Sequence, residues 1–341
     1  MTALVKSPAA LSEALESSAL AGTDRGAGGP EVLRPRSTII VTSDGTNGSD
    51  GAIRMALGMV DRADTELEVL TVVGGGQGEG PDELLPEQGD DTARRREQRD
   101  AVEVQVARVS GGSHVHPVTV INGSAARTIA RVAAERHATL VIVGLGRHDL
   151  TDRLCGTETA IQLARVSRVP ILAVREDAVA LTSRALVAVD FSEHSERAAQ
   201  AAIDLMGGTG LVELVHVTPY VAEYPSSVQG HEPYKRWARG QLDALIGRLV
   251  AAPGVTLTRI ILRGRTAQAL LARARAVGAD LIAVGTHGRG FAARALLGSV
   301  TTDLLRGAHC AVLVVPSDPL SLSTPPGGER AVSALRPARA D

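Results

Sequence analysis

The chain has few aromatic residues and few cysteines. Aromatics make up 2% of its 341 residues, and all six lie after residue 190. The first half therefore offers no ring on which a nucleic-acid base could stack. Two cysteines, Cys155 and Cys310, form neither a disulfide framework nor a metal site by themselves, which fits a reducing compartment.

An excess of either charge is also missing, as are long hydrophobic runs. The formal net charge is -2, so no global field favours nucleic acid or an anionic membrane as a partner. No segment approaches 18 apolar residues, and the first thirty residues lack the pattern of a signal peptide. We therefore expect a cytoplasmic protein that binds neither nucleic acid nor membrane.

Short apolar runs alternate with amphipathic stretches along most of the chain, which is typical of parallel sheets built from βαβ units. The strands expected in the first half are 37–44, 66–73, 116–123, 139–146 and 170–176. Those expected in the second half are 185–190, 211–219, 256–264, 280–287 and 310–316. We expect one loop after the second strand of each set, at 74–91 in the first half and at 220–234 in the second.

The two sets of strands have the same spacing, which indicates an internal duplication. Asp44 and Asp190 lie 146 residues apart, and Gly156 and Gly298 lie 142 apart. The predicted fold is α/β, with two doubly wound five-stranded parallel-sheet domains of strand order 3-2-1-4-5. The expected boundaries are a flexible tail at 1–35, domains at 36–177 and 184–317, and a second tail at 318–341.

The segment between the fourth strand and the last helix of the second half carries the clearest motif. Its pattern is Gly285-x2-Gly288-x9-Gly298-Ser299. Glycines let a backbone approach a ligand closely, and the free N–H groups of a helix that begins at Gly298-Ser299 favour an anion. The alternative is a glycine turn followed by an N-capping serine.

Asp190 follows the first strand of the same unit and precedes a capped helix start. In the 3-2-1-4-5 order, strands one and four are neighbours whose connections leave on opposite faces, so a crevice opens at their carboxyl ends. A carboxylate there can accept hydrogen bonds from a ribose or a base. Its alternative role is an Asx cap of the next helix.

These motifs resemble those of the universal stress protein family. VAVDFSEHSERAAQAA, LVHV and LLGSVTTDLLRGAHCAVLVV follow the family pattern, and the resemblance extends over about residues 37–316. It implies ATP with Mg²⁺ as the ligand, and an intrachain pseudo-dimer that pairs the apolar edges PILAVRE and CAVLVVP; a homodimer is an open alternative. The implied site residues are Asp190, Val217, Gly285, Gly288, Gly298, Ser299 and Val300. Thr286 is added from the same glycine segment, and His287 and Arg289 are added because they flank Gly288 and could reach phosphate oxygens; a solvated role is the alternative for these two.

The first half departs from the family pattern. It retains Asp44, Gly156 and Thr157, but its glycine turn is one residue shorter, Gly144-x-Gly146. Shortening a tight turn redirects its N–H groups, so we expect the first half to be mainly architectural, although weak nucleotide binding there stays open.

The resemblance favours an ATP-binding stress-response module over an enzyme. No general base is evident beside the glycine motif, so any ATP hydrolysis should be slow. Two other classes stay open: a nucleotidyl-transfer or ATP-pyrophosphatase enzyme with this type of sheet, and a nucleotide-free interaction protein. The physiological signal and the regulatory partner are not indicated by the sequence.

Overall fold

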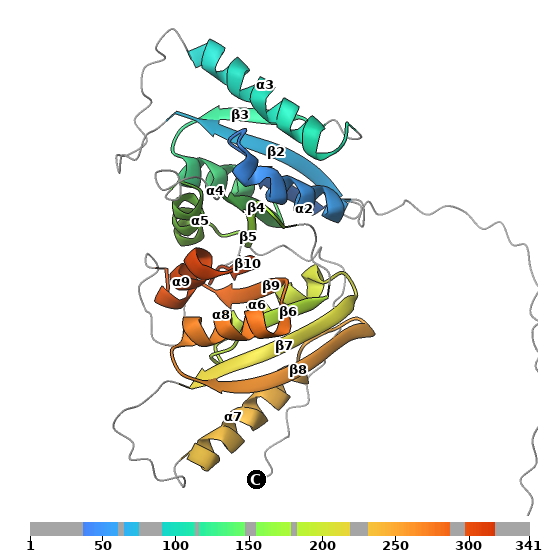
Figure 1. The fold of residues 1–341 in the computed structure, drawn as a ribbon, viewed down its shortest axis with the longest axis vertical. Coiled ribbons are helices and arrows are strands. Elements are labelled where there is room, and N and C mark those ends of the chain that lie inside the picture. The colour runs from blue at the N-terminus through green and yellow to red at the C-terminus, as the bar shows by residue number, and fades with distance from the viewer. Residues whose placement is uncertain are drawn as a thin grey trace, which may run out of the picture. The chain divides into compact units, whose positions relative to one another are not determined.

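The computed structural model describes residues 37–60, 65–74, 91–112, 116–146, 155–178, 183–218, 231–286 and 297–317. Strands and helices alternate in two successive sets, as the duplication predicts (Figure 1). The first-half strands are β1 (Ser37–Thr42), β2 (Thr65–Val73), β3 (Val118–Asn122), β4 (Leu140–Leu145) and β5 (Ile171–Arg175). The second-half strands are β6 (Arg184–Ala188), β7 (Thr209–Thr218), β8 (Gly254–Arg263), β9 (Leu281–Gly285) and β10 (Ala311–Val315).

Helices connect these strands. Those of the first half are α2 (Asp50–Val60), preceded by the 3-10 helix η2 (Asn47–Ser49), then α3 (Asp91–Val109), α4 (Ala125–Glu135) and α5 (Cys155–Val166). Those of the second half are α6 (Glu193–Leu205), α7 (His231–Ile246), α8 (Thr266–Val277) and α9 (Ser299–Gly307). The expectation of a loop at 220–234 is wrong for its last four residues, because α7 begins at His231.

The ten strands form one sheet of order β3-β2-β1-β4-β5-β10-β9-β6-β7-β8. Each half therefore has the predicted order 3-2-1-4-5 with parallel neighbours, which confirms the fold class. The halves meet where β5 pairs with β10 antiparallel, and this confirms the intrachain pseudo-dimer.

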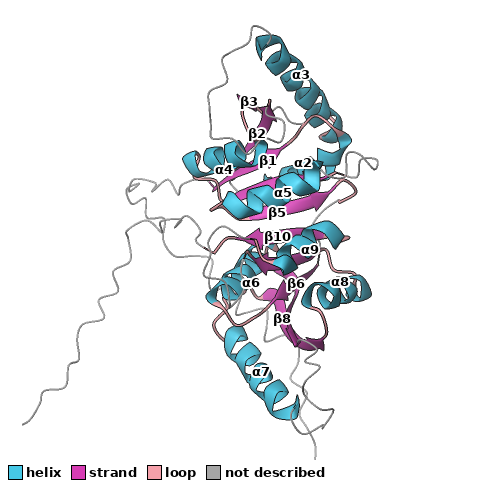
Figure 2. Ribbon diagram, turned by 90° about the vertical axis from the view of Figure 1, so that its left-hand side faces the viewer, coloured by secondary structure: helices cyan, strands magenta, loops and turns pink. Residues whose placement is uncertain are grey.

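Helices cover both faces of the sheet (Figure 2). Residues of α2, α3, α6 and α7 pack in one hydrophobic core, and residues of α4, α5, α8 and α9 pack in the other. Alternate strand residues point to opposite cores: Ile39 and Val41 to the first, Ile40 to the second. Burial on both faces explains the continuous apolar runs of the sequence. In the part of the chain that the structure describes, no helix combines the length and apolarity that a membrane crossing requires.

The strand pairs at the junction between the halves are all apolar. Val312 pairs with Ala173, Leu313 with Leu172 and Val314 with Ile171. None of these residues is more than 2% exposed. An unpaired edge of this composition would expose apolar side chains and backbone polar groups to water. The pairing buries these side chains and provides hydrogen-bond partners for the backbone groups.

The backbone that leaves β5 lies directly on α2. A Cβ at Gly51 would come 1.9 Å from the carbonyl oxygen of Arg175, so no larger residue fits there without movement. Arg54 donates a hydrogen bond to the carbonyl of the following residue, Glu176. In the second half Arg197 of α6 donates to the carbonyl of Ser317 at 2.6 Å, which holds the chain after β10 in the same way.

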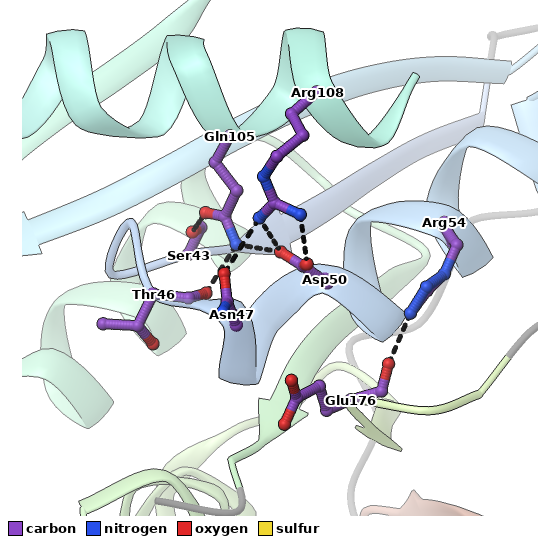
Figure 3. A network of polar contacts seen from close by, with 8 residues as sticks. All are labelled: Ser43, Thr46, Asn47, Asp50, Arg54, Gln105, Arg108 and Glu176. Atoms are coloured by element: carbon purple, nitrogen blue, oxygen red, sulfur yellow. Dashed lines mark hydrogen bonds and ion pairs between the residues drawn. The ribbon is translucent and has the colours of Figure 1, made fainter. Parts of the chain in front are cut away.

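An ion pair also occurs in both halves, between the helix after the first strand and the segment after the second. Arg108 contacts Asp50 through two hydrogen bonds of 2.7 and 2.8 Å (Figure 3). Arg248 contacts Glu196 through two of 2.7 and 3.0 Å. Asp50 and Glu196 are 146 residues apart, the same offset as Asp44 and Asp190, so the duplication extends to tertiary contacts.

The Asp50 pair belongs to a larger polar network in the first half. Gln105 of α3 donates to Asp50 Oδ1 at 2.7 Å and to the carbonyl of Thr46, and it accepts a hydrogen bond from the Ser43 hydroxyl (Figure 3). Burial raises the pKa of Asp50, but the hydrogen bonds from Arg108 and Gln105 outweigh it and hold the pKa below its ordinary value of 3.8.

We expect Gly51→Ala to destabilise the chain and Gly58→Ala, in the same helix, to stabilise it slightly. The new methyl group at 51 must displace the Arg175 carbonyl, whereas nothing lies within 4 Å of the Cβ position at Gly58. In an open helical position Ala is favoured over Gly by about 0.5 to 1 kcal/mol. Urea unfolding of both variants tests this; equal stabilities would contradict the close contact.

We expect Asp50→Asn to lower the free energy of unfolding by about 1 to 2 kcal/mol at pH 7, the range for a lost charge-assisted bond to a half-exposed arginine. The folded pKa of Asp50 is depressed, so its contribution is present above the ordinary value of 3.8 and is lost as pH falls through the folded pKa. The stability difference between parent and variant should therefore shrink from pH 7 to pH 3. A constant difference would show that the charge does not matter.

Candidate functional site

The candidate site lies at the carboxyl ends of two neighbouring strands in the second half. β6 and β9 pair in parallel, with Ala185 opposite Leu281 and Val187 opposite Ala283. The chain continues from β6 into α6, in one core, and from β9 towards α9, in the other. The two connections therefore leave on opposite faces, which is the arrangement that opens a crevice in a doubly wound sheet.

Asp190 lies two residues beyond the end of β6, in a turn that caps α6. Its Oδ1 accepts hydrogen bonds from the backbone N–H of Ser192 at 3.0 Å and from the Ser192 hydroxyl at 2.5 Å. The Ser192 side chain in turn accepts from the N–H of Ser195 and forms the N-cap. The N-cap of α6 is thus Ser192 rather than Asp190, and the Asx turn that Asp190 forms with Ser192 fixes where the carboxylate lies.

Val217 and Val300 pack in the same core, on the face of the sheet that α9 covers. Val217 is 7% exposed, and Val300 is a half-buried residue of the first turn of α9. The last pair between β6 and β7 is Ala188 with Val215, so Val217 extends beyond the end of β6. Its backbone therefore lies past the carboxyl end of β6, on the strand next to it.

Gly298 forms the start of α9. Its N–H donates to the carbonyl of Thr286 at 3.0 Å, and a Cβ at this position would come 3.2 Å from that same oxygen. Gly298 is the N-cap residue and supplies no side-chain cap, while Ser299 is exposed as the first helical residue. The helix start that the sequence predicts is therefore present, with a close backbone approach at the glycine.

Gly285 has a packing role that the sequence analysis missed. A Cβ there would come 3.2 Å from the Cβ of His194, so the glycine lets the first turn of α6 lie against the end of β9. The carbonyl of Gly285 accepts a hydrogen bond from the Thr301 hydroxyl, which links β9 to α9. The neighbouring Thr286 is buried, and its hydroxyl lies 2.8 Å from the Ser317 hydroxyl.

Three of the site residues expected from the sequence, His287, Gly288 and Arg289, lie outside the described residues. Within the described ranges, His, Cys, Asp and Glu side chains form no group of three or more that could hold a metal ion.

The first half has the same layout with different chemistry. Asp44 Oδ1 accepts three hydrogen bonds, from the N–H and hydroxyl of Thr46 and from the Ser49 hydroxyl. Gly144 lets η2 lie against β4, since a Cβ there would come 2.6 Å from the Gly48 carbonyl.

The helix that follows β4 also starts differently. α5 begins at Cys155, so Gly156 lies inside it, whereas Gly298 precedes α9. Thr157 is half-buried in the same first turn, and a Cβ at Gly156 would come 2.9 Å from the N of Gly146. By the offset of 142 between Gly156 and Gly298, Ser299 corresponds to Thr157, so α5 begins two residues earlier than α9 does. The other cysteine, Cys310, is a buried thiol, and burial raises its pKa to about 12.

The sequence analysis did not identify a group of four rings beside Asp190, formed by Phe191, His216, Tyr234 and Trp237. The available signal was the restriction of all aromatic residues to positions after 190.

Comparison with known proteins identifies relatives of both halves. The model of the universal stress protein family matches residues 35–175 and again residues 182–316. A universal stress protein of Mycolicibacterium smegmatis is 32% identical over 198 residues, covering 56% of this chain and 66% of that protein. A universal stress protein of Thermus aquaticus is 32% identical over 132 residues, covering 38% of this chain and 96% of that protein. The chain thus spans slightly less than two thirds of the mycobacterial relative.

A solved structure agrees with the fold. The universal stress protein from Archaeoglobus fulgidus DSM 4304 superposes with a TM-score of 0.59 at 17% identity, covering 83% of this chain and 99% of that one. Since the two matches to the family model together span most of the chain, it belongs to the universal stress protein family and carries two of its domains in tandem.

Proposed function

We propose that this chain binds ATP, together with Mg²⁺, at the carboxyl ends of β6 and β9, and acts as a nucleotide-dependent stress-response module in the cytoplasm. The observation that carries the proposal is the placement of Asp190 and the glycine start of α9 after two adjacent strands, on opposite faces of the sheet. In this proposal the domains extend over 36–177 and 184–317.

The described residues suit the two ends of a nucleotide. The N-terminus of α9 begins at a glycine, so its N–H groups and helix dipole favour a phosphate that can approach without meeting a Cβ. Asp190, in the turn that leads into α6, suits the uncharged hydroxyl and amine donors of the nucleoside. His287, Gly288, Arg289 and Ser299 would add donors to the phosphates, and Val217 and Val300 would border the base or ribose.

The first half is proposed to be architectural. Its helix α5 begins before the glycine, and the Oδ1 of its aspartate accepts three local hydrogen bonds. The earlier helix start reduces what the N–H groups of α5 can offer to a phosphate, and the local bonds of Asp44 occupy its Oδ1. Binding rather than catalysis is proposed for the second half, since ATP hydrolysis needs a positioned base beside the phosphates.

Calorimetric titration with ATP and Mg²⁺ should find one tight site per chain. Two equal sites would contradict the architectural role of the first half. Release of pyrophosphate during incubation would favour the nucleotidyl-transfer class, and a complete lack of binding would favour the interaction protein.

Gly298→Val should abolish ATP binding, because a branched side chain would occupy the approach to the N–H groups of α9. Gly58→Val, in the first half where nothing lies within 4 Å, is the matched control and should bind like the parent. Asp190→Ala should weaken binding by about 1 to 3 kcal/mol, the range for leaving its hydrogen-bond partner unpaired, and Asp44→Ala should leave the affinity unchanged.

Circular dichroism establishes that each variant is folded before titration. A folded Gly298→Val protein that binds ATP like the parent would refute the nucleotide assignment. Asp190→Asn retains an acceptor oxygen but loses the negative charge, so an unaltered affinity in this variant would show that the charge of Asp190 does not contribute to binding.

A further inference from the structure

Four rings form a cluster immediately beside Asp190. Phe191 and His216 have ring centroids 4.4 Å apart, and Phe191 and Trp237 meet edge to face at 5.3 Å. Tyr234 lies 5.4 Å from Trp237 and 6.1 Å from His216. The cluster joins the turn after β6, strand β7 and helix α7. Such pairs stabilise a fixed arrangement beyond the burial of area alone.

His216 is buried at 8% exposure and bonded through both ring nitrogens. Its Nδ1 lies 2.8 Å from the carbonyl oxygen of Val189, and its Nε2 lies 2.8 Å from the Tyr234 hydroxyl. A carbonyl oxygen only accepts, so Nδ1 carries the proton and donates. In the neutral ring Nε2 then accepts from the Tyr234 hydroxyl, and this fixes the tautomer.

His216 therefore contacts both neighbours of Asp190. Its Nδ1 binds the carbonyl of the preceding residue, Val189, and its ring packs on the side chain of the following residue, Phe191. Phe191 has a φ of 64°, in the left-handed region that bulky residues rarely adopt. Such a conformation persists only where surrounding contacts impose it, and the ring contacts with His216 and Trp237 are those contacts.

The first half achieves the same result with polar groups, which is independent support. The equivalent of Phe191 is Gly45, with a φ of 81° that glycine adopts without strain. The equivalent of His216 is Thr71, because each residue follows the last position at which the second strand pairs with the first. Gln98 of α3 donates to the carbonyl of Asp44 at 2.8 Å and to the Thr71 hydroxyl at 3.2 Å. In both halves the helix after the second strand thus reaches the turn that holds the aspartate.

We propose that His216 is the positioning residue for Asp190, and that Tyr234 sets the tautomer in which it acts. His216 holds Val189 and Phe191 so that the carboxylate between them is presented to the nucleoside. This inference rests on the proposed function. It gives α7 an indirect role in nucleotide binding, because Tyr234 and Trp237 of this helix support the Asp190 turn without contacting the ligand.

The test uses the full chain and measures the Asp190 turn without nucleotide. The reporter is the amide N–H of Ser192, which donates to Asp190 Oδ1. Nuclear magnetic resonance gives its chemical shift and its hydrogen-exchange rate for the parent, His216→Phe, His216→Asn and Tyr234→Phe. His216→Phe retains a ring and loses both hydrogen bonds, whereas His216→Asn retains a donor near the Nδ1 position. Gln98→Ala is the matched control in the first half.

We expect the Ser192 resonance to shift in His216→Phe and its exchange to accelerate about tenfold through local opening, with a smaller change in Tyr234→Phe. His216→Asn should recover part of the protection, and Gln98→Ala should leave Ser192 unchanged. ATP affinity should fall about tenfold in His216→Phe and about threefold in Tyr234→Phe. Trp237, the only tryptophan of the chain, should report ATP binding to the parent by a change in fluorescence.

An unchanged Ser192 resonance and exchange rate in both His216→Phe and Tyr234→Phe would overturn the positioning role, whatever the affinities. Tyr234→Phe changes a single hydroxyl, so it decides the question even where His216→Phe fails to fold. If the parent binds no ATP, the proposed function fails, and the Ser192 measurement still decides whether His216 holds the turn.

Discussion

The antiparallel pairing of β5 with β10 is the contact on which the rest of the structure depends. Both strands are apolar on both faces, so neither can remain at the edge of a sheet in water. Their pairing makes one sheet of ten strands from two sets of five. Because the strands within each half are parallel and the junction is antiparallel, the carboxyl ends of the two sets point in opposite directions. The Asp44 and Asp190 turns therefore follow strand ends on opposite sides of the sheet, at the two ends of the strands. The chemistry of one turn could change independently of the other.

The two halves retain the same framework while their polar chemistry differs. The ion pairs Asp50–Arg108 and Glu196–Arg248 occupy equivalent places, and an arginine holds the chain after the last strand in each half. At the aspartate turn the halves differ: Gln98 of α3 donates to the carbonyl of Asp44, whereas His216 and the rings around it contact the two neighbours of Asp190. The conserved contacts support the sheet. The divergent ones concentrate where the two halves are proposed to differ in function.

Much of the fold follows from the sequence, because each strand is an apolar run and the duplication repeats the order. Strand ends were less predictable: Asp44 and Asp190 were expected to end their strands, but β1 ends at Thr42 and β6 at Ala188. Ser43 and Val189, which follow these ends, still donate backbone hydrogen bonds to the second strand of their half, so no change in residue type marks where the strand ends.

The start of α7 was missed for a different reason. The segment 220–234 was expected to be a loop, although its Pro233 is compatible with the first turn of a helix, where the missing N–H of proline has no partner to lose. Tyr234 was consequently assigned to a loop, and the ring cluster beside Asp190 could not be recognised. The role of Gly51 was equally hidden, since its neighbour Arg175 is distant in the sequence and only the folded chain brings them together.

Fusing two domains through their most apolar strands leaves the single sheet with only two outer edges, at β3 and β8. The long edge, β8, carries Arg259 and Arg263 along its ten residues, and Arg259 is paired with Asp243 of α7. Charged side chains on an edge strand oppose the addition of a further strand from another molecule. The duplication thereby produces a continuous ten-stranded sheet whose β8 edge opposes the addition of a strand from another molecule.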